Sequence, residues 1–479
     1  MLIDGVKPLR NEDSALPMEG RIRSWISWGF LIIAIVIHIA FISSLQTGLL
    51  NPLFYDTNYL VGQGADFFSY YQAGNNVLNG LDCYAIPDPL VVPYLYPYRY
   101  LPYFAYTFGV LLNLTTPILA YWLWVGILTV SVWMAALRTR SLAKTLNRPN
   151  WESRIAIGMW FMFTPIYIEL FLGQVTLFAA ILMFFALTTP SFVNGQNTRW
   201  TMTILWIVSS LTKLIPFFIT PVLLGAGKAR SVLMAIVVTV IAIVAVPAGL
   251  ESLQFFLGFN TARTIYLSGY VGSHSLKMLI YYLLGESTND FSIITGFLIG
   301  IFLMLASIAT LYSRDVWTCA SLFSISYFFI MTDVWEHHYT FILPLLVLAW
   351  IRGRPEDKGR WIPVMIVLLM SLPMIPIVAF LSGAGSSVHP ITWSPVWQIV
   401  YHSSKVVPTL LFFMWLLMTA FRSPRNDSFV ESIVSTFKNA WNGLIKGTSL
   451  SIEGGILVRI KHENVQQAPD VIESKIRED

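Results

Sequence analysis

Long apolar segments separated by short polar ones make up most of this chain, and its two ends are polar. A straight helix needs about 20 apolar residues to cross a bilayer, and residues 25–45 form the first such run. Two later pairs of runs are shorter, so we expect each pair to be a half-depth hairpin, with its turn at Gly173-Gln174 or at Lys213. Irregular backbone at that depth is tolerated only beside protein or a water-filled cavity, so these turns predict a cavity on the outer side. The pattern predicts twelve spans, at residues 25–45, 117–137, 155–170, 174–189, 201–213, 215–227, 231–249, 291–312, 317–332, 338–350, 361–381 and 403–421.

The polar segments divide the chain into a head at residues 1–24, a membrane domain at 25–421 and a tail at 422–479. Residues 46–116 are too polar to cross the bilayer as a whole, and we predict a long loop with an interfacial helix at 100–114. In the tail, apolar residues recur on one helical face, which predicts a helix at the membrane surface. A loosely ordered tail is the alternative. The apolar residues of this face are Phe429, Ile433, Phe437, Trp441 and Leu444.

Composition excludes a water-soluble protein, because 56% of the residues are hydrophobic and only 12% are charged. Soluble domains carry about 25% charged residues, so the surroundings of most side chains must be membrane lipid. We expect no nucleic-acid partner. Basic residues cluster at 138–154 and 351–360, whereas the predicted loop at 46–116 contains one, Arg99. Cytoplasmic loops carry the excess of Lys and Arg, so both termini are predicted to be cytoplasmic and the loop at 46–116 to be external.

Polar motifs gather at the turns that this topology places in the outer half of the membrane. Ionisable groups at membrane depth are costly and usually mark a functional site. The predicted outer loop carries GADFFSYYQAG at residues 64–74, GLDCY at 80–84 and YPYRYLP at 96–102. Later turns carry GQVTL at 173–177, TKLIP at 212–216, GSHSL at 272–276 and WEHHY at 335–339.

In these motifs and their order, the chain resembles the GT-C glycosyltransferases, and closely the glycosyltransferase family 87 mannosyltransferases that depend on polyprenol-phosphate-mannose. GQVTL resembles the family's Gly-Gln-x-Asn turn, with Thr176 in place of Asn, and GSHSL resembles its Asn-Gln-Ser-Leu element, with His274 in place of Gln. TKLIP resembles its Lys-x-x-Pro element and WEHHY its histidine-bearing turn. The resemblance covers residues 25–420 and implies an all-α GT-C fold, in which the first outer loop forms a lid over a cavity open to the outer leaflet.

The resemblance further implies that the protein transfers a hexose, by family mannose, from a polyprenyl-phosphate sugar to a lipid or glycan acceptor. The expected place is the external face of a bacterial plasma membrane. Other polyprenyl-phosphate hexoses or pentoses, such as arabinose, stay open as donors. No cofactor is expected beyond this lipid-linked donor.

The family's catalytic aspartate maps onto Asp66. A sugar phosphate already has a good leaving group, with a second phosphate pKa of about 6, so one carboxylate that takes the acceptor proton suffices. Hydrolytic glycosidases, in contrast, need two carboxylates. A base opposite the leaving phosphate implies single displacement with inversion. Asp66 stands without an acidic neighbour, which argues against a divalent metal at this point.

Other polar residues are candidates for binding the substrates, because the departing phosphate needs cationic or hydrogen-bonding partners. The candidates for the donor phosphate are Lys213, Arg99, His337 and His338. The candidates for the rest of the substrates are Gln174, Tyr96 and His274.

Structural alternatives exist for these residues. Asp66 could be a helix N-cap, Lys213 and Arg99 could extend their charges to the interface, and Gly173-Gln174 could be a packing turn. Asp82 and Asp88 are predicted as turn residues.

A metal site is the alternative for the histidine-bearing turn, built from Asp333, Glu336, His337 and His338. Adjacent helical residues point about 100° apart, and no spaced pair of ligands is present. We therefore expect no metal there.

Two other functions compete with that of a glycosyltransferase. A secondary transporter would have broken helices in matching positions of its two halves, but both short pairs lie in the first half of this chain. A non-catalytic subunit of an envelope-glycan assembly complex would keep the fold and would not need Asp66. The substitution Asp66→Asn distinguishes this subunit from the enzyme.

Overall fold

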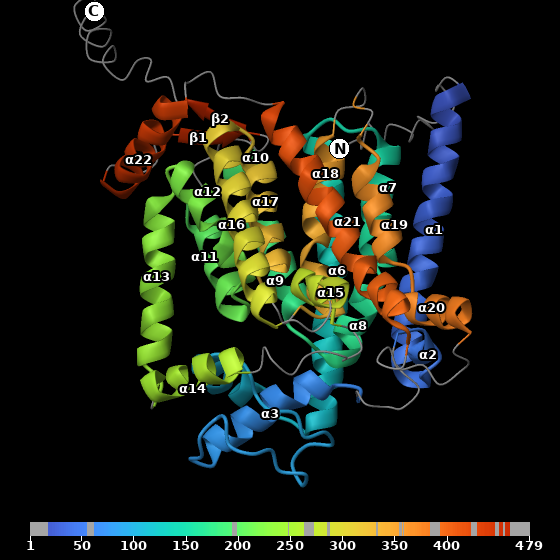
Figure 1. Cartoon of the computed structure of the whole chain (residues 1–479), viewed down its shortest axis with the longest axis vertical. Helices are drawn as coiled ribbons and strands as arrows, with labels where there is room; N and C mark the ends of the chain where they lie inside the picture. Colours follow the sequence, from blue (N-terminus) through green and yellow to red (C-terminus); the bar gives the residue numbers. More distant parts are fainter. Residues whose placement is uncertain are drawn as a thin grey trace, which may run out of the picture.

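The computed structural model of the chain is almost entirely helical (Figure 1). The described residues are 18–54, 62–193, 199–247, 249–262, 273–284, 288–331, 334–353, 357, 359–383, 393–422, 429–445, 450–453 and 456–459. The exception within them is an antiparallel hairpin of β1 (Leu450–Glu453) and β2 (Ile456–Arg459). The all-α prediction is therefore confirmed except in the tail, where a Gly-Gly pair between two β-forming runs was the hairpin signal in the sequence.

The elements follow one another in a single helical series, in which η2 is a π-helix and η3 and η5 are 3-10 helices. The helices are α1 (Met18–Thr47), α2 (Asn51–Phe54), α3 (Ala65–Leu78), α4 (Pro102–Phe104), η2 (Ala105–Gly109), α5 (Val110–Leu112), α6 (Pro117–Thr145), α7 (Asn150–Met162), α8 (Pro165–Leu172), α9 (Thr176–Leu187), α10 (Pro190–Val193), α11 (Arg199–Thr212), η3 (Ile215–Ile219), α12 (Thr220–Gly225), α13 (Ala229–Val244), α14 (Gly249–Ala262), α15 (Leu276–Leu284), α16 (Thr288–Tyr312), α17 (Val316–Ile330), η5 (Glu336–Phe341), α18 (Leu343–Arg352), α19 (Ile362–Met370), α20 (Met374–Ser382), α21 (Pro395–Phe421) and α22 (Phe429–Ile445).

Several helices are long and apolar enough to cross a membrane, as expected of a membrane protein. Three qualify singly by length and composition, namely Gly20–Thr47, Pro117–Thr145 and Pro395–Phe421. Within the described residues the number rises to six if three bent pairs, α7 with α8, α13 with α14 and α19 with α20, each count as one span. The count of twelve stays a prediction, because the other apolar helices have only 10–17 residues.

Two predicted boundaries differ from the helices. The first helix begins at Met18 rather than at residue 25, so Arg21 and Arg23 belong to its first turns instead of to a polar head. The predicted span at 155–170 is bent by 42° between α7 and α8. Pro165 begins α8 at this bend, and a proline lacks the N–H that a continuous helix requires.

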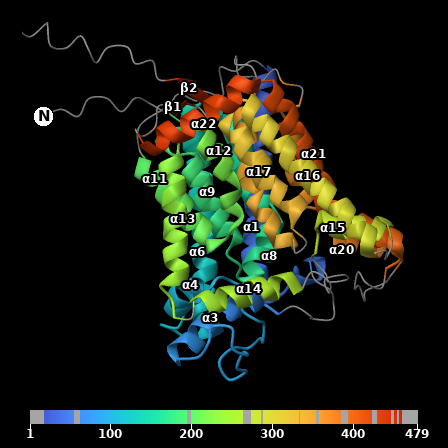
Figure 2. The ribbon, with the colours of Figure 1, turned by 60° about the vertical axis from the view of Figure 1, so that its left-hand side comes forward.

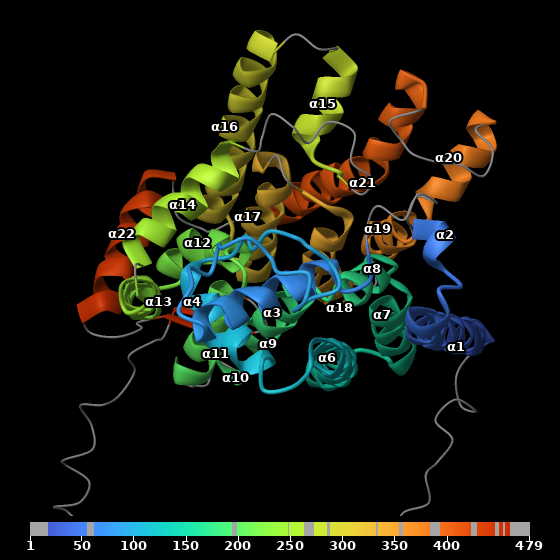
Figure 3. The ribbon, with the colours of Figure 1, turned by 90° about the horizontal axis from the view of Figure 1, so that it is seen from below.

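The long helices run side by side, and shorter elements cross their two ends. Figures 1 and 2 show α3 and α14 at one end of the bundle and α22 at the opposite end. Seen from below, α3 lies across the near end of the bundle (Figure 3), where it contacts α6 and α8. The predicted interfacial helix at 100–114 corresponds to α4, η2 and α5.

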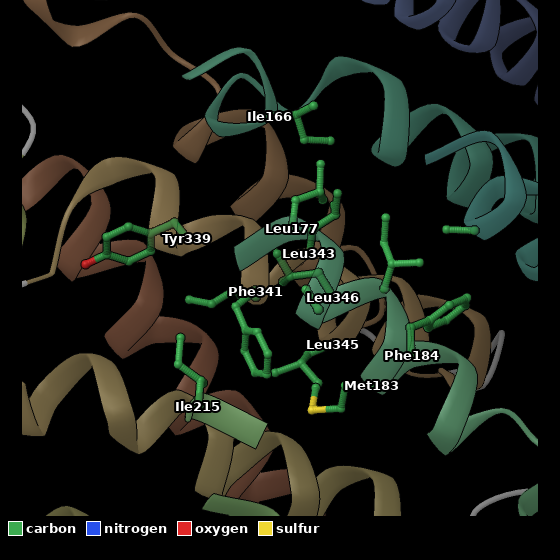
Figure 4. Close-up of a cluster of buried hydrophobic side chains, with 14 of the residues drawn as sticks. Ile166, Leu177, Met183, Phe184, Ile215, Tyr339, Phe341, Leu343, Leu345 and Leu346 are labelled. Carbon is green, nitrogen blue, oxygen red and sulfur yellow. The ribbon is translucent and has the colours of Figure 1, made fainter. Parts of the chain in front are cut away.

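The apolar core holds the two predicted short hairpins together. Side chains of α8, α9, η3, η5 and α18 meet in one buried cluster (Figure 4). Ile166, Leu177, Ile215, Phe341 and Leu345 are each at most 1% exposed in this cluster. Since the turns of both hairpins and η5 adjoin the cluster, packing brings their polar residues to one region of the molecule.

The predicted tail helix is present as α22, which packs across α12, α13 and α16. Gly443 lies so close to Gly227 that a Cβ there would meet the Gly227 carbonyl oxygen at 2.1 Å. Phe437 and Trp441 are 72% and 63% exposed. The helix is thus confirmed, whereas its position at a membrane surface stays a prediction.

A close backbone contact joins α3 to the π-helix η2. A Cβ on Gly74 would lie 2.1 Å from the carbonyl carbon and oxygen of Gly109. Asn113 also ties the two elements, because its Nδ2 donates to the Tyr71 carbonyl at 2.8 Å and to the Gly109 carbonyl at 2.9 Å. The position of α3 therefore depends on a residue without a side chain at position 74.

We predict that Gly74→Ala lowers the free energy of unfolding by about 1–3 kcal/mol, the usual range for overpacking. The backbone of η2 cannot move aside without disturbing its own hydrogen bonds. Gly126→Ala is the matched control, because a Cβ at this helical glycine meets no atom within 4 Å. Unfolding of the detergent-solubilised variants would measure both, and equal stability of the two would contradict the close contact.

Candidate functional site

Asp66 lies in the first turn of α3, and its side chain is half-buried. Gly64 occupies the N-cap position of this helix, so the alternative that Asp66 is the N-cap is wrong. The Gly64 N–H donates to the Phe171 carbonyl at 2.7 Å, which attaches the start of α3 to the end of α8. A carboxylate in the first turn of a helix is favoured by the helix dipole. Asp66 is therefore held next to the turn between α8 and α9.

That turn presents Gln174 in a fixed orientation. Gly173 adopts a φ of 67°, and a Cβ there would lie 2.6 Å from the Cβ of Phe67. The indole Nε1 of Trp124 donates to the carbonyls of Gly173 and Gln174, at 3.0 and 3.2 Å. The turn is thus shaped by close packing, as its structural alternative proposed, and the same packing aims the Gln174 amide at two tyrosines.

A hydrogen-bonded network joins Gln174 to Lys213 through the Tyr100 hydroxyl. This hydroxyl donates to Gln174 Oε1 at 2.7 Å and accepts a hydrogen bond from Lys213 Nζ at 3.1 Å. The Tyr70 hydroxyl lies 2.8 Å from Gln174 Oε1 and 3.0 Å from the Tyr100 hydroxyl. The Lys213 ammonium also lies 5.0 Å from the centre of the Tyr100 ring, a cation–π distance.

Both tyrosines stay protonated in this environment. Burial raises the pKa of Tyr70, and the nearby Tyr100 and Asp66 raise it further. Burial likewise raises the pKa of Tyr100, against the opposing effect of the Lys213 ammonium. Neutral phenols can donate hydrogen bonds, so they orient Gln174 through its carbonyl oxygen.

Glu169 is a site residue that the sequence analysis did not select. Its side chain is fully buried on α8, and Oε1 accepts a hydrogen bond from the Leu177 N–H at 2.7 Å. Oε2 is also buried and has no hydrogen-bond partner among the described residues. Glu169 lies close enough to Lys213 and Asp66 to interact with both electrostatically. The available signal was an acidic residue inside the apolar run PIYIELFL.

His337 and His338 belong to η5, which packs against α8 and α9. Their ring centroids are 4.3 Å apart, and both rings are close enough to Lys213 to interact with its charge. His338 Nδ1 accepts a hydrogen bond from the Trp335 N–H at 3.1 Å. His337 Nε2 is buried without a partner among the described residues. This nitrogen is available to a ligand, whereas His338 is partly committed to the backbone.

Arg99, Tyr96 and His274 are the other predicted substrate-binding residues. Arg99 is half-buried and directly precedes Tyr100, and Tyr96 packs against the apolar core. His274 belongs to a second polar cluster, with its Nε2 4.0 Å from Glu336 Oε2. The structure therefore joins Gln174 directly to Lys213 through Tyr100, and it separates His274 from that network.

The alternatives for the acidic residues are resolved in part. Asp82 and Asp88 are turn residues, as predicted, because each Oδ1 accepts a backbone N–H two residues on, at 2.8 Å. Asp333, one residue of the alternative metal site, lies outside the described residues. Among those described, no three His, Cys, Asp or Glu side chains are grouped so that they could hold a metal ion.

A comparison with protein families matches residues 94–332 to glycosyltransferase family 87. The matched segment contains Tyr100, Glu169, Gln174 and Lys213, and it ends before His337. No curated protein and no solved structure shows a significant match to the chain.

Tyr100→Phe is predicted to lower the free energy of unfolding by about 1–3 kcal/mol, the cost of leaving buried polar groups without a partner. The change removes the hydroxyl that joins Lys213 to Gln174. Tyr312→Phe serves as the control, because that side chain is 39% exposed on α16. Denaturant unfolding in detergent measures the difference, and equal losses in both variants would contradict the role of the network.

Proposed function

The chain is a membrane glycosyltransferase with a glycosyltransferase family 87 domain at residues 94–332, and from this premise we propose its donor, acceptor and catalytic base. The donor is a polyprenyl-phosphate hexose, with mannose favoured by the motifs of the sequence. The acceptor is a lipid or glycan on the non-cytoplasmic face. The reaction proceeds with inversion and without a metal ion.

The observation that carries this proposal is the placement of Asp66 beside the network of Lys213, Tyr100 and Gln174. Asp66 interacts electrostatically with Tyr100 of that network, with Tyr70, which is hydrogen-bonded to it, and with Glu169. One base and one cationic anchor are what a sugar with a phosphate leaving group requires.

In the proposed step, an acceptor hydroxyl gives its proton to the Asp66 carboxylate. The acceptor oxygen forms a bond to the anomeric carbon from the face opposite the phosphate. The bond between that carbon and the phosphate oxygen breaks, and the phosphate leaves with the electron pair. The Lys213 ammonium stabilises the negative charge that develops on it. Attack opposite the leaving group inverts the anomeric carbon.

The remaining candidates have supporting roles. His337 Nε2 is suited to hydrogen-bond the phosphate, because it is buried without a partner among the described residues. His338 and Arg99 are further candidates for the phosphate, and Gln174 for a sugar hydroxyl. Tyr96 and His274 are retained as substrate contacts on the strength of the sequence resemblance.

The proposed topology has twelve spans, cytoplasmic termini and an external site, in a bacterial plasma membrane. Figure 1 supports the proposed orientation in the membrane, because the first residues of α1 and the last residues of α21 lie on the side of the bundle opposite α3. Arg21, Arg23 and Arg422 lie at those helix ends. Basic residues favour the cytoplasmic side, so Asp66, at the start of α3, is expected on the external side. The family match does not favour the transporter alternative.

Asp66→Asn is predicted to lower sugar transfer by about 10²–10⁴-fold, the usual contribution of a general base. The assay uses purified protein in liposomes, radiolabelled polyprenyl-phosphate-mannose, total lipid extract as acceptor, and EDTA. Asp82→Asn is the matched control, because Asp82 is exposed in a turn of the same segment and should retain wild-type transfer.

Each result of this assay has a definite meaning. Transfer by wild type and not by Asp66→Asn would establish a metal-independent enzyme with this base. Equal transfer by both would remove Asp66 from the mechanism. If wild type is inactive, other polyprenyl-phosphate sugars replace mannose, and inactivity with all of them would favour the non-catalytic subunit.

Lys213→Met is predicted to lower kcat by about 10²–10³-fold, the effect of removing one group that stabilises the charge of a transition state. Lys144→Met is the control, because Lys144 is exposed in the last turn of α6. Steady-state kinetics in the same liposomes measures both variants. A normal kcat in Lys213→Met would show that another group stabilises the leaving phosphate.

A further inference from the structure

A second charged pair is buried near the histidines of η5. The Lys405 ammonium lies 2.8 Å from Glu336 Oε1, and their side chains are only 1% and 9% exposed. Burying an ion pair costs several kcal/mol per ion in desolvation, and a well-packed apolar pair is often as stable. Stability alone is therefore a weak reason for the presence of this pair.

Lys405 connects three elements of the bundle. It is carried by α21, it forms the ion pair with the first residue of η5, and its ammonium also donates to the Met370 carbonyl at the end of α19. His402 lies three residues earlier, on the same face of α21. Its Nδ1 is 2.6 Å from the Ser273 carbonyl oxygen, and its ring stacks on Tyr282 at 4.7 Å.

The segment at Ser273 in turn holds the residues before η5. Ser273 and Trp335 form an isolated β-bridge, and the His274 N–H donates to the Val334 carbonyl at 2.7 Å. The Tyr339 hydroxyl donates to the His274 carbonyl at 2.5 Å. The start of η5 is therefore attached to α21 twice, directly through Glu336 and indirectly through the segment at Ser273.

His337 and His338 directly follow Glu336 in the same short 3-10 helix. A 3-10 helix has poorer hydrogen-bond geometry than an α-helix, and its length is limited for that reason. External anchors therefore matter for the position of its side chains. Any shift of Glu336 would move both rings relative to Lys213, with whose charge they interact.

We propose that Glu336 and Lys405 are positioning residues, whose ion pair holds His337 and His338 in place for the leaving phosphate. This inference rests on the proposed function, because it assumes that His337 and His338 bind the leaving phosphate of that reaction. The pair itself touches no substrate. Its effect on the reaction is transmitted through the backbone of η5.

The test replaces both charges at once, with Glu336→Gln and Lys405→Met in one chain. Single variants would leave an uncompensated buried charge and could fail to fold for that reason. The matched control is the double variant Glu152→Gln with Arg360→Met. It removes another buried ion pair, of 2.7 Å, which lies at the start of α7 and therefore away from the turn of α8 and α9.

Four quantities are measured for each double variant: the apparent unfolding temperature, kcat, KM for the donor, and hydrogen exchange of the backbone at residues 336–341. Both variants are expected to fold and to lose a similar amount of thermal stability. The first should lower kcat by about 10²-fold, the size of effect that misplacement of groups by 1 Å can have, and should accelerate exchange at 336–341. The control should leave kcat and that exchange unchanged.

Wild-type kcat and exchange in the first variant would overturn the proposal, since the pair would then be only structural. An equal fall of kcat in both variants would overturn it too, because the effect would follow from lost stability. If wild type transfers no sugar from any donor, the proposed function fails. Hydrogen exchange then tests separately whether the ion pair anchors η5. Unchanged exchange at residues 336–341 would reject the anchoring, and accelerated exchange in the first variant alone would support it.

Discussion

The hydrogen bond from Lys213 to the Tyr100 hydroxyl is the interaction on which the arrangement of the site depends. Lys213 follows α11, Tyr100 precedes α4, and Gln174 lies between α8 and α9. Lys213 is half-buried, and an ammonium that is partly withdrawn from water is costly unless it is paired or hydrogen-bonded. The hydrogen bonds that stabilise this one charge therefore connect three separate parts of the chain. Asp66 joins them because the start of α3 is attached to Phe171 at the end of α8.

The charges around this hydrogen bond fit the proposed reaction, in which a phosphate anion leaves. Lys213 is cationic, and the His337 ring offers a nitrogen that has no partner among the described residues. Asp66 and Glu169 supply carboxyl groups in the same neighbourhood, but they differ in setting. Asp66 is half-buried at the edge of the bundle, whereas Glu169 is fully buried and accepts a backbone hydrogen bond. A proton acceptor for an external substrate must be reachable, which favours Asp66 over Glu169 as the base.

Buried ion pairs join elements of the helical bundle that are distant in the sequence. Glu152 and Arg360 connect α7 to the residues before α19, and the Arg360 guanidinium also lies over the rings of Trp151 and Trp350. Glu336 and Lys405 connect η5 to α21. Lipid offers no hydrogen-bond partners to helices that diverge, so such pairs select one relative placement of the helices at a cost in desolvation.

The sequence by itself determined that the chain is a helical membrane protein, because long apolar runs separated by polar turns would not be stable in water. It also indicated Asp66, Gln174, Lys213 and His337 as candidates, through the resemblance of their motifs to those of family 87 and because ionisable groups at membrane depth are costly. The tail hairpin and the early start of α1 were missed, because short-range patterns set element boundaries only loosely.

Only the tertiary structure decided which of these residues meet. Gln174 lies 74 residues after Tyr100 in the sequence, and Lys213 lies 113 residues after it. The contacts of these residues depend on how α3, α8, α9 and α11 pack. Tyr70 lies in the motif at residues 64–74 but nothing in the sequence singles it out there, and Glu169 is marked only by its acidity within an apolar run. The pairing of Glu336 with Lys405 links positions that no local pattern relates. His274 lies in this second cluster rather than in the predicted substrate site for the same reason. Burial and distance are properties of the packed chain, and local periodicity contains neither.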